Sequence, residues 1–391
     1  MARVVLAMSG GVDSSVAAHL LLQQGHEVIG VFMRHGEESS QQCNVPAAAD
    51  SDGAANAAVA TLPVLGELPQ GRADHKQGCC TASDAADAKR VAAMMGIPFY
   101  SLDLQADFRR IVDYFVDDYL NGRTPNPCVK CNHWIKFGRL FDYADGVMAD
   151  YVATGHYARM VNGQLHRGLD DRKDQSYALF GIRPERLPRM LLPVGDYSKP
   201  EIRDLALSLN LGVAGKKDSQ EICFVTQGHH SDFVKARRPD MVGKTAGDFV
   251  DLEGNVLGQH PGYEAFTVGQ RKKLGIALGT PHFVVRIEPD TCRVVLAEKE
   301  ALAAPGLSAQ QANWLIPHER LQQTLDQAHQ SDQLRVQIRY NGSPEPASVR
   351  VDPDDSELFE VHFDHPVDAV APGQAAVVYQ NNQVLGGGWI R

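Results

Sequence analysis

A glycine-rich segment near the N-terminus constrains the fold of this 391-residue chain more than any other feature. The apolar run Arg3–Leu6 leads into the segment Ala7, Met8, Ser9, Gly10, Gly11, Val12, Asp13, Ser14, and a helical pattern follows it. This order predicts a strand, a tight turn and the first turn of a helix. Adjacent glycines let a ligand approach the backbone, while hydroxyls and helical N–H groups bind phosphate. The segment matches neither the Walker A pattern nor the dinucleotide pattern Gly-x-Gly-x-x-Gly.

Ser-Gly-Gly-Val-Asp-Ser at 9–14 resembles the PP-loop of ATP pyrophosphatases, which split ATP between its α and β phosphates and transfer AMP to a substrate. The alternative is an ordinary strand-to-helix turn. Beside a bound triphosphate, Asp13 is expected to help hold Mg²⁺. Its alternative role is that of an acid favoured by the helix dipole.

The remaining pattern predicts three domains. Strands alternate with helices up to residue 225, which predicts an α/β domain with a doubly wound parallel sheet. Hairpins then predict a small β-rich central domain at 226–300, and short alternating strands at 301–391 predict a β-barrel, with a sandwich as the alternative. Segment 39–75 is rich in Ala, Gly, Pro, Ser and Asp, so we expect a disordered insertion there.

Two local predictions concern helix starts. Ser83 is expected to cap a helix at 85–95. The segment 122–132 contains two prolines, which predicts a rigid loop that delivers Cys131 to the start of the next helix. A helix N-terminus lowers the pKa of a thiol, so Cys131 is a candidate nucleophile.

Composition limits the compartment and the partners. No signal-peptide pattern or transmembrane-length apolar run occurs, so we expect a cytoplasmic protein without membrane contact. The net charge of −10 argues against nucleic acid, and DNA is not an expected partner. However, residues 121–190 carry more basic than acidic side chains, which leaves room for a local basic surface.

The cysteines narrow the chemistry. Seven irregularly placed cysteines argue against a secreted disulfide framework. Cys128 and Cys131 form a Cys-x-x-Cys pair, and Cys223 stands apart. A structural zinc site normally has four ligands, so two thiols acting in sequence explain the pattern better: one carries a persulfide, and the other releases its sulfur by forming a disulfide. An adenylated carbonyl and a persulfide together exchange oxygen for sulfur.

At these residues the sequence resembles the bacterial tRNA-specific 2-thiouridylases. The resemblance covers nearly the whole chain except segment 39–75. It depends on Ser-Gly-Gly-Val-Asp-Ser, Gly-Arg-Thr-Pro-Asn-Pro-x-x-x-Cys-Asn, Ala-Thr-Gly-His-Tyr, Lys-Asp-Gln-Ser-Tyr and Gln-Glu-Ile-Cys-Phe. The combination is far more specific than any one motif.

The resemblance implies an enzyme that uses ATP with Mg²⁺ to activate O2 of the wobble uridine, in the anticodon loop of tRNA, and then delivers sulfur to C2. It makes Cys131 the nucleophile and Cys223 the carrier of a persulfide that a sulfur-donor protein supplies. It places ATP against Ala7–Ser14, Met33 and Gly155, although Met33 has the spacing of a core methionine as well. Asn126, Pro127 and Cys128 border the target base. Further tRNA contacts are expected at His156, Lys173, Asp174, Gln175, Arg339, Tyr340 and Gln374.

Three alternatives remain open. A different PP-loop enzyme, such as an amide-forming synthetase, would share the ATP loop. A catalytically silent RNA-binding protein would share the tRNA contacts. Within the thiouridylase hypothesis, Cys128, Cys131 and Cys223 could instead hold an iron–sulfur cluster whose open iron carries the sulfur. Cys128 also departs from the family pattern, which has Asp at this position.

Overall fold

The N-terminal part of this computed structural model contains a five-stranded parallel sheet; the structure describes residues 1–34, 81–216, 222–225 and 228–391. The strand order is β3 (Phe99–Asp103), β2 (Glu27–Arg34), β1 (Arg3–Ala7), β4 (Tyr151–Ala153) and β7 (Met190–Leu191). The prediction of a doubly wound sheet is confirmed. The predicted insertion 39–75 lies outside the described residues.

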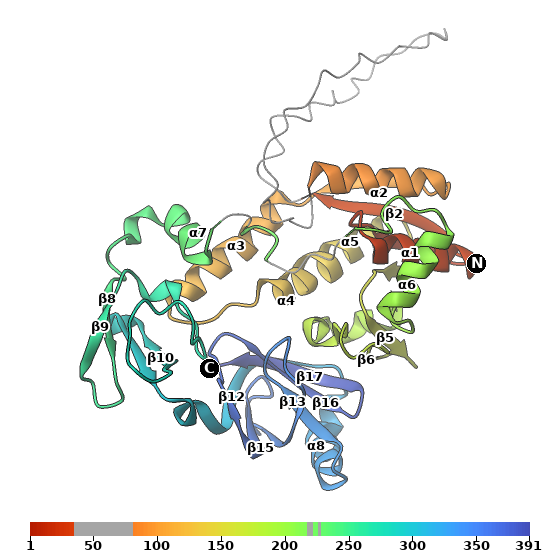
Figure 1. Cartoon of the computed structure of the whole chain (residues 1–391). Coiled ribbons are helices and arrows are strands. Elements are labelled where there is room, and N and C mark those ends of the chain that lie inside the picture. Colours follow the sequence, from red (N-terminus) through yellow and green to blue (C-terminus); the bar gives the residue numbers. More distant parts are fainter. Residues whose placement is uncertain (35–80, 217–221, 226–227) are drawn as a thin grey trace, which may run out of the picture.

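Helices cover both faces of this sheet (Figure 1). Alternate residues of β1 enter two different cores, because successive strand side chains point to opposite faces. Val5 and Ala7 belong to one core, and Val4 and Leu6 to the other. The helices are α1 (Val12–Gln23), α2 (Ala82–Met94), α3 (Gln105–Leu120), α5 (Leu140–Gly146) and α6 (Lys199–Ser208).

The start of α2 corrects one prediction. The N-cap residue is Thr81, not Ser83: its hydroxyl accepts from the Asp84 backbone N–H at 3.1 Å, and the Asp84 carboxylate accepts from the Thr81 N–H at 2.9 Å. This reciprocal pair satisfies two donors, whereas Ser83 lies inside the first turn.

The predicted rigid loop at 122–132 is also corrected. Helix α4 (Pro127–Cys131) begins inside it and continues without a break into a π-helix, η2 (Asn132–Arg139), and then into α5. Asn126 caps α4 by accepting from the Val129 N–H at 3.3 Å. Pro127 occupies the first helical position, where a missing N–H costs nothing. Cys131 therefore lies one turn inside a helix and not at its start.

The central β-rich part contains a four-stranded sheet, in the order β10 (Phe283–Glu288), β11 (Arg293–Ala297), β8 (Gly247–Val250) and β9 (Val256–His260). Its small core packs around Phe249 and Phe266. Helix α7 (His230–Arg237) precedes it. Short 3-10 turns are η5 (Pro239–Met241), η6 (Tyr263–Ala265), η7 (Pro289–Thr291) and η8 (Lys299–Leu302).

The C-terminal part is a closed barrel, as predicted. Its strands follow the order β12 (Ala303–Trp314), β15 (Phe359–Asp368), β14 (Glu345–Val351), β13 (Leu334–Gln337), β16 (Ala375–Gln380) and β17 (Gln383–Ile390), and β12 pairs with β17 to close it. Helix α8 (Leu321–Gln330) follows the short turn η9 (His318–Arg320). The sequence did not reveal β17, whose Gly386–Gly388 run lacks a strand signature. A Cβ on Gly386 would lie 2.6 Å from the Asn313 carbonyl oxygen, so this close pairing requires glycine.

A hairpin of the N-terminal part joins the barrel sheet. Strands β5 (Ala158–Val161) and β6 (Gln164–Arg167) extend it, with His166 pairing with Gln383 of β17. The short helices η3 (Ser176–Leu179) and η4 (Pro184–Arg189) follow. The pairing of β6 with β17 thus crosses the expected domain boundary at residue 225. It fixes the barrel against the N-terminal α/β domain. Within the described ranges, no helix is long and apolar enough to cross a membrane.

Candidate active site

The glycine-rich segment forms the predicted turn between β1 and α1. Gly10 has a φ of +71°, and a Cβ there would lie 2.1 Å from the Asp84 carbonyl oxygen, so only glycine fits. Ser14 closes the turn, because its hydroxyl accepts from the Ser9 N–H at 3.2 Å and donates to the Gly11 carbonyl at 3.2 Å. The side chains of Ala7, Met8 and Val12 are buried in the core, so these residues offer a ligand only their backbone.

Gly155, which follows β4, packs directly against this turn. A Cβ at Gly155 would lie 2.7 Å from the Ser14 backbone nitrogen. The ends of β1 and β4 therefore meet at the centre of the sheet, where doubly wound folds bind their ligands. Met33, at the end of β2, packs against two hydrophobic cores while remaining partly exposed, so it has the core contacts that its spacing allowed.

Asp13 has partners that the sequence did not indicate. The Lys199 ammonium lies 2.7 and 2.9 Å from the two Asp13 carboxylate oxygens, and the Tyr157 hydroxyl donates to one of them at 2.7 Å. The Lys199 side chain is only 7% exposed, and that of Asp13 is 30% exposed. Asp13 therefore belongs to a half-buried ion pair. Lys199 begins α6, and no local motif connects it to a loop 186 residues earlier.

A second lysine holds the outside of the turn. The Lys216 ammonium donates to the Gly10 carbonyl at 3.0 Å and contacts the carboxylates of Asp84 and Asp87 at 2.5 and 2.9 Å. Burial is the largest single influence on the Lys216 pKa and lowers it. The hydrogen bonds and charges of the two carboxylates act together in the other direction, so the pKa is raised above its usual value. Lys216 thus ties the glycine-rich turn to the start of the segment that leads to Cys223.

Two of the three candidate thiols pack against the same hydrophobic cluster. Cys131 and Cys223 are half-buried, and both pack against the hydrophobic cluster of α3 that contains Phe108, Ile111 and Phe115. Cys128 is exposed on the first turn of α4. The described residues contain no group of three His, Cys, Asp or Glu side chains placed to hold a metal ion, so geometry adds no support to the iron–sulfur alternative.

The loop before α4 is held by the barrel. The Gln374 side-chain amide donates to the carbonyls of Thr124 and Pro125 at 3.1 and 3.2 Å and accepts from the Asn126 side chain at 3.3 Å. The Thr124 N–H donates to the Pro372 carbonyl at 2.7 Å. Gln374 therefore supports the loop that is expected to border the target base. The sequence had indicated Gln374 as a tRNA contact and had not indicated this supporting role.

The other expected tRNA contacts divide into buried and exposed residues. His156 is buried: Nδ1 lies 2.7 Å from the Thr154 hydroxyl, and burial lowers its pKa well below the usual value. The Asp174 carboxylate accepts from the Gly168 N–H at 2.9 Å and the Ser176 hydroxyl at 2.8 Å. Both residues have internal structural contacts.

Arg339 and Tyr340 are exposed at the end of β13. Partial loss of solvent around its hydroxyl raises the pKa of Tyr340, and this hydroxyl hydrogen-bonds to the Gln175 side chain. Gln175 also accepts from the Tyr157 N–H at 2.9 Å. Two of the expected tRNA contacts, Gln175 and Tyr340, therefore lie next to each other.

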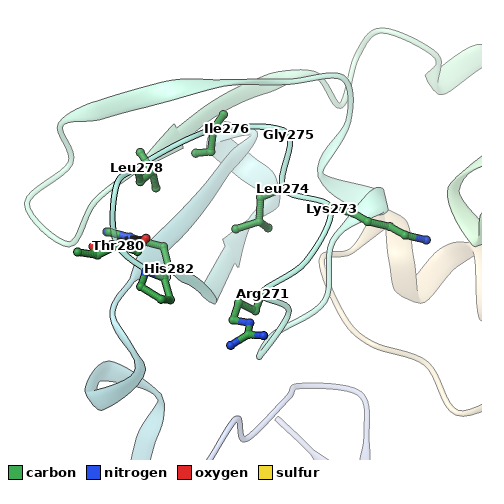
Figure 2. A pocket seen from close by; sticks show the side chains of 9 residues that line it. Arg271, Lys273, Leu274, Gly275, Ile276, Leu278, Thr280 and His282 are labelled. Atoms are coloured by element: carbon green, nitrogen blue, oxygen red, sulfur yellow. Dashed lines mark hydrogen bonds between the residues drawn. The ribbon is translucent and has the colours of Figure 1, made fainter.

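The central domain contains a pocket of about 240 Å³ that combines basic and apolar side chains. Arg271 and Lys273 line it together with Leu274, Ile276 and Leu278 (Figure 2). In Figure 2 the Lys273 side chain extends away from the loop. Arg271 and Lys273 therefore offer basic side chains in the central domain and not at the glycine-rich turn.

Family models match the chain in three parts. "tRNA methyl transferase HUP domain" matches residues 2–65 and 65–227. "tRNA methyl transferase PRC-barrel domain" matches 231–298, and "Aminomethyltransferase beta-barrel domain" matches 304–390. Among solved structures, a 4-thiouridine synthetase–RNA complex with bound ATP is 12% identical, covering 61% of this chain and 51% of its own, but its TM-score of 0.35 supports no argument.

Whole-chain relatives are much more similar. The tRNA-specific 2-thiouridylase MnmA of Rhodopirellula baltica is 68% identical over 100% of this chain and 96% of its own length. The protein of the same name from Carboxydothermus hydrogenoformans is 42% identical over 99% of this chain and 97% of its own length. The chain therefore belongs to the tRNA-specific 2-thiouridylase family.

Proposed function

We propose that this protein is an ATP-dependent tRNA sulfurtransferase that replaces O2 of the wobble uridine with sulfur and releases AMP and pyrophosphate. The observation that carries the proposal is the 68% identity, over the whole chain, to a relative named tRNA-specific 2-thiouridylase. The turn between β1 and α1 and the two thiols near α3 supply the parts that such a reaction needs.

In the first step, ATP binds at the turn of residues 9–14. Backbone N–H groups and the Ser9 hydroxyl bind its phosphates at the start of α1. The uridine O2 attacks the α-phosphorus, and pyrophosphate leaves. Lys199 offers a positive charge next to the same turn.

Asp13 is suited to a magnesium ion held mainly by phosphates, because Mg²⁺ in nucleotide sites commonly takes only one or two protein carboxylates. Asp13 is partly exposed at the turn, and a carboxylate bound to Lys199 retains lone pairs for a second cation. Such an ion would neutralise charge on the leaving pyrophosphate.

In the second step, the outer sulfur of a Cys223 persulfide attacks C2 of the activated uridine, and AMP leaves with the former O2. The Cys131 thiolate then attacks the inner sulfur. This forms a Cys131–Cys223 disulfide and leaves the outer sulfur on the base. A sulfur-donor protein supplies the persulfide, and a thiol reductant supplies the two electrons that restore both thiols.

The target base enters beside Asn126–Cys128, on the first turn of α4, where the Cys128 side chain is exposed. An unpaired anticodon base can be turned into such a site at low cost. We assign the phosphate contacts of the tRNA to the basic loop of the central domain, which includes Arg271 and Lys273. The substrate places the reaction in the cytoplasm.

Mass spectrometry of digested tRNA tests the proposal. Unmodified tRNA is incubated with the protein, ATP, Mg²⁺ and a persulfide source, and AMP is measured in the same sample. The proposal predicts 2-thiouridine and tRNA-dependent AMP. AMP without 2-thiouridine would instead indicate a different PP-loop enzyme, and tRNA binding without either product would indicate a silent RNA-binding protein.

A further inference from the structure

Lys130, between the two cysteines of α4, has an unusual environment for a charged side chain. It is buried, at 9% exposure, and its ammonium faces three aromatic rings. The ammonium lies 4.0 Å from the ring centre of Trp389, 5.2 Å from that of Trp134 and 5.3 Å from that of Tyr114. Such distances permit cation–π attraction to each ring.

The three rings come from three separate elements. Tyr114 is on α3, Trp134 is on η2, and Trp389 is on β17 of the barrel. The rings also contact one another, with Tyr114 6.3 Å from Trp134 and 6.1 Å from Trp389. We call α4, which carries Cys128 and Cys131, the thiol helix. One side chain of this helix therefore joins the N-terminal domain to the C-terminal barrel.

A charged residue is a costly choice for a purely structural role here. Burial lowers the pKa of Lys130 to about 8, and Asp118, the acid that opposes this shift, is itself bound by Arg123 at 2.6 Å. A well-packed apolar side chain commonly serves stability as well as or better than a buried charge. A lysine at this position thus suggests a requirement other than stability.

We propose that Lys130 is a positioning residue: its contact with the barrel ring Trp389 fixes the turn that carries Cys128 and Cys131 relative to the barrel residues that support the base-binding loop. This inference rests on the proposed function and deepens it. An ammonium held between ring faces restricts both the rotation and the tilt of the short helix α4. Gln374 and Pro372 hold the preceding loop from the same side.

The inference separates stability from catalysis. In Lys130→Met the apolar stem is retained and the charge removed, so the unfolding temperature should stay equal or rise. The kcat of thiolation should fall about tenfold or more, because small misplacements of reacting groups have large effects. The KM for tRNA and the affinity for ATP should change little, and Lys130→Arg should recover part of kcat. Lys89→Met, an exposed lysine of α2, is the matched control.

A double-mutant cycle identifies the partner. Trp389→Leu removes the barrel ring, and its effect on kcat should not add to that of Lys130→Met, because both remove one contact. Additive effects would contradict the inference. So would a Lys130→Met protein with unchanged kcat, or one whose unfolding temperature falls in step with kcat, which would indicate a structural role.

Hydrogen exchange provides a readout that does not depend on activity. Peptides covering 122–131 should exchange faster in Lys130→Met and in Trp389→Phe, while peptides of the glycine-rich turn should not change. If wild-type protein makes no 2-thiouridine, the proposed function fails, but this exchange pattern would still support the Lys130 contact. Unchanged exchange at 122–131 in both variants would overturn the inference in either case.

Discussion

The glycine-rich turn that is proposed to bind ATP, here called the ATP turn, and the thiol helix are built in different ways. The turn at residues 9–15 is closed mainly by its own hydrogen bonds, such as those from the Ser14 and Ser15 hydroxyls to the Gly11 carbonyl. The thiol helix is held by distant segments, as in the contact between Asn126 and Gln374, which are 248 residues apart. The turn thus forms largely from its own residues, whereas the loop that leads into Cys128 and Cys131 is positioned by the barrel.

The largest expected effects come from the two thiols. Cys131→Ser and Cys223→Ser should each abolish 2-thiouridine formation, because one thiol carries the sulfur and the other releases it. ATP binding should remain, since the turn that binds the phosphates is built from residues 9–15. Quantitative mass spectrometry of tRNA digests and ATP titration measure the two properties.

Cys292→Ser, which changes a thiol of the central domain, is the control for these variants and should remain active. Cys128→Ala should retain thiolation with weaker base positioning. Loss of activity in Cys128→Ala together with bound iron and sulfide would favour the iron–sulfur alternative.

The next effect concerns the ATP turn. Asp13→Asn should lower thiolation about 100-fold, because it removes the carboxylate that would help hold Mg²⁺ beside the triphosphate. It should also cost about 1–3 kcal/mol of stability, because Lys199 loses its carboxylate. Adding Lys199→Met should restore stability without restoring activity. Kinetics and urea unfolding of the three proteins check this, and recovery of activity in the double variant would rule out a catalytic role for Asp13.

These contrasts explain what the sequence could predict. The turn, the parallel sheet and the barrel follow from local motifs and periodicity, and they were predicted correctly. The start of α4 was not, because Pro127 can either end regular structure or begin a helix, and Asn126 decides between these. The partners Lys199, Gln374 and Trp389 depend on tertiary contacts between distant segments, which a single sequence does not reveal.

A smaller effect is expected at the barrel contact. Gln374→Ala removes the hydrogen bonds to the Thr124 and Pro125 carbonyls, so the base-binding loop should loosen. We expect kcat to fall about tenfold while ATP affinity is unchanged, because positioning losses of this kind act on the chemical step. Gln330→Ala, on an exposed end of α8, is the control. Weakened ATP binding in Gln374→Ala would contradict the separation of the two regions.

A separate effect, on stability and not on catalysis, is acid sensitivity from two buried histidines. Burial lowers the pKa of His133 and of His230 to about 4. Between about pH 6.5 and 4 the unfolded chain therefore binds more protons than the folded one, and stability falls as pH falls, by up to about 1.4 kcal/mol per pH unit for each histidine. Urea unfolding at pH 7 and 5 measures this. His230→Phe should reduce the loss, and an equal loss in that variant would assign it to other groups.

The most direct test of the central claim separates activation from sulfur transfer in one turnover. Cys223→Ser is mixed with tRNA and ATP labelled at the α-phosphate, and pyrophosphate, labelled tRNA and 2-thiouridine are measured together. Activation at the turn and sulfur delivery at the thiol helix predict release of pyrophosphate and label on the tRNA, without 2-thiouridine. Pyrophosphate release abolished along with thiolation would show that the two regions do not act separately, and 2-thiouridine at the wild-type level would exclude Cys223 as the sulfur carrier.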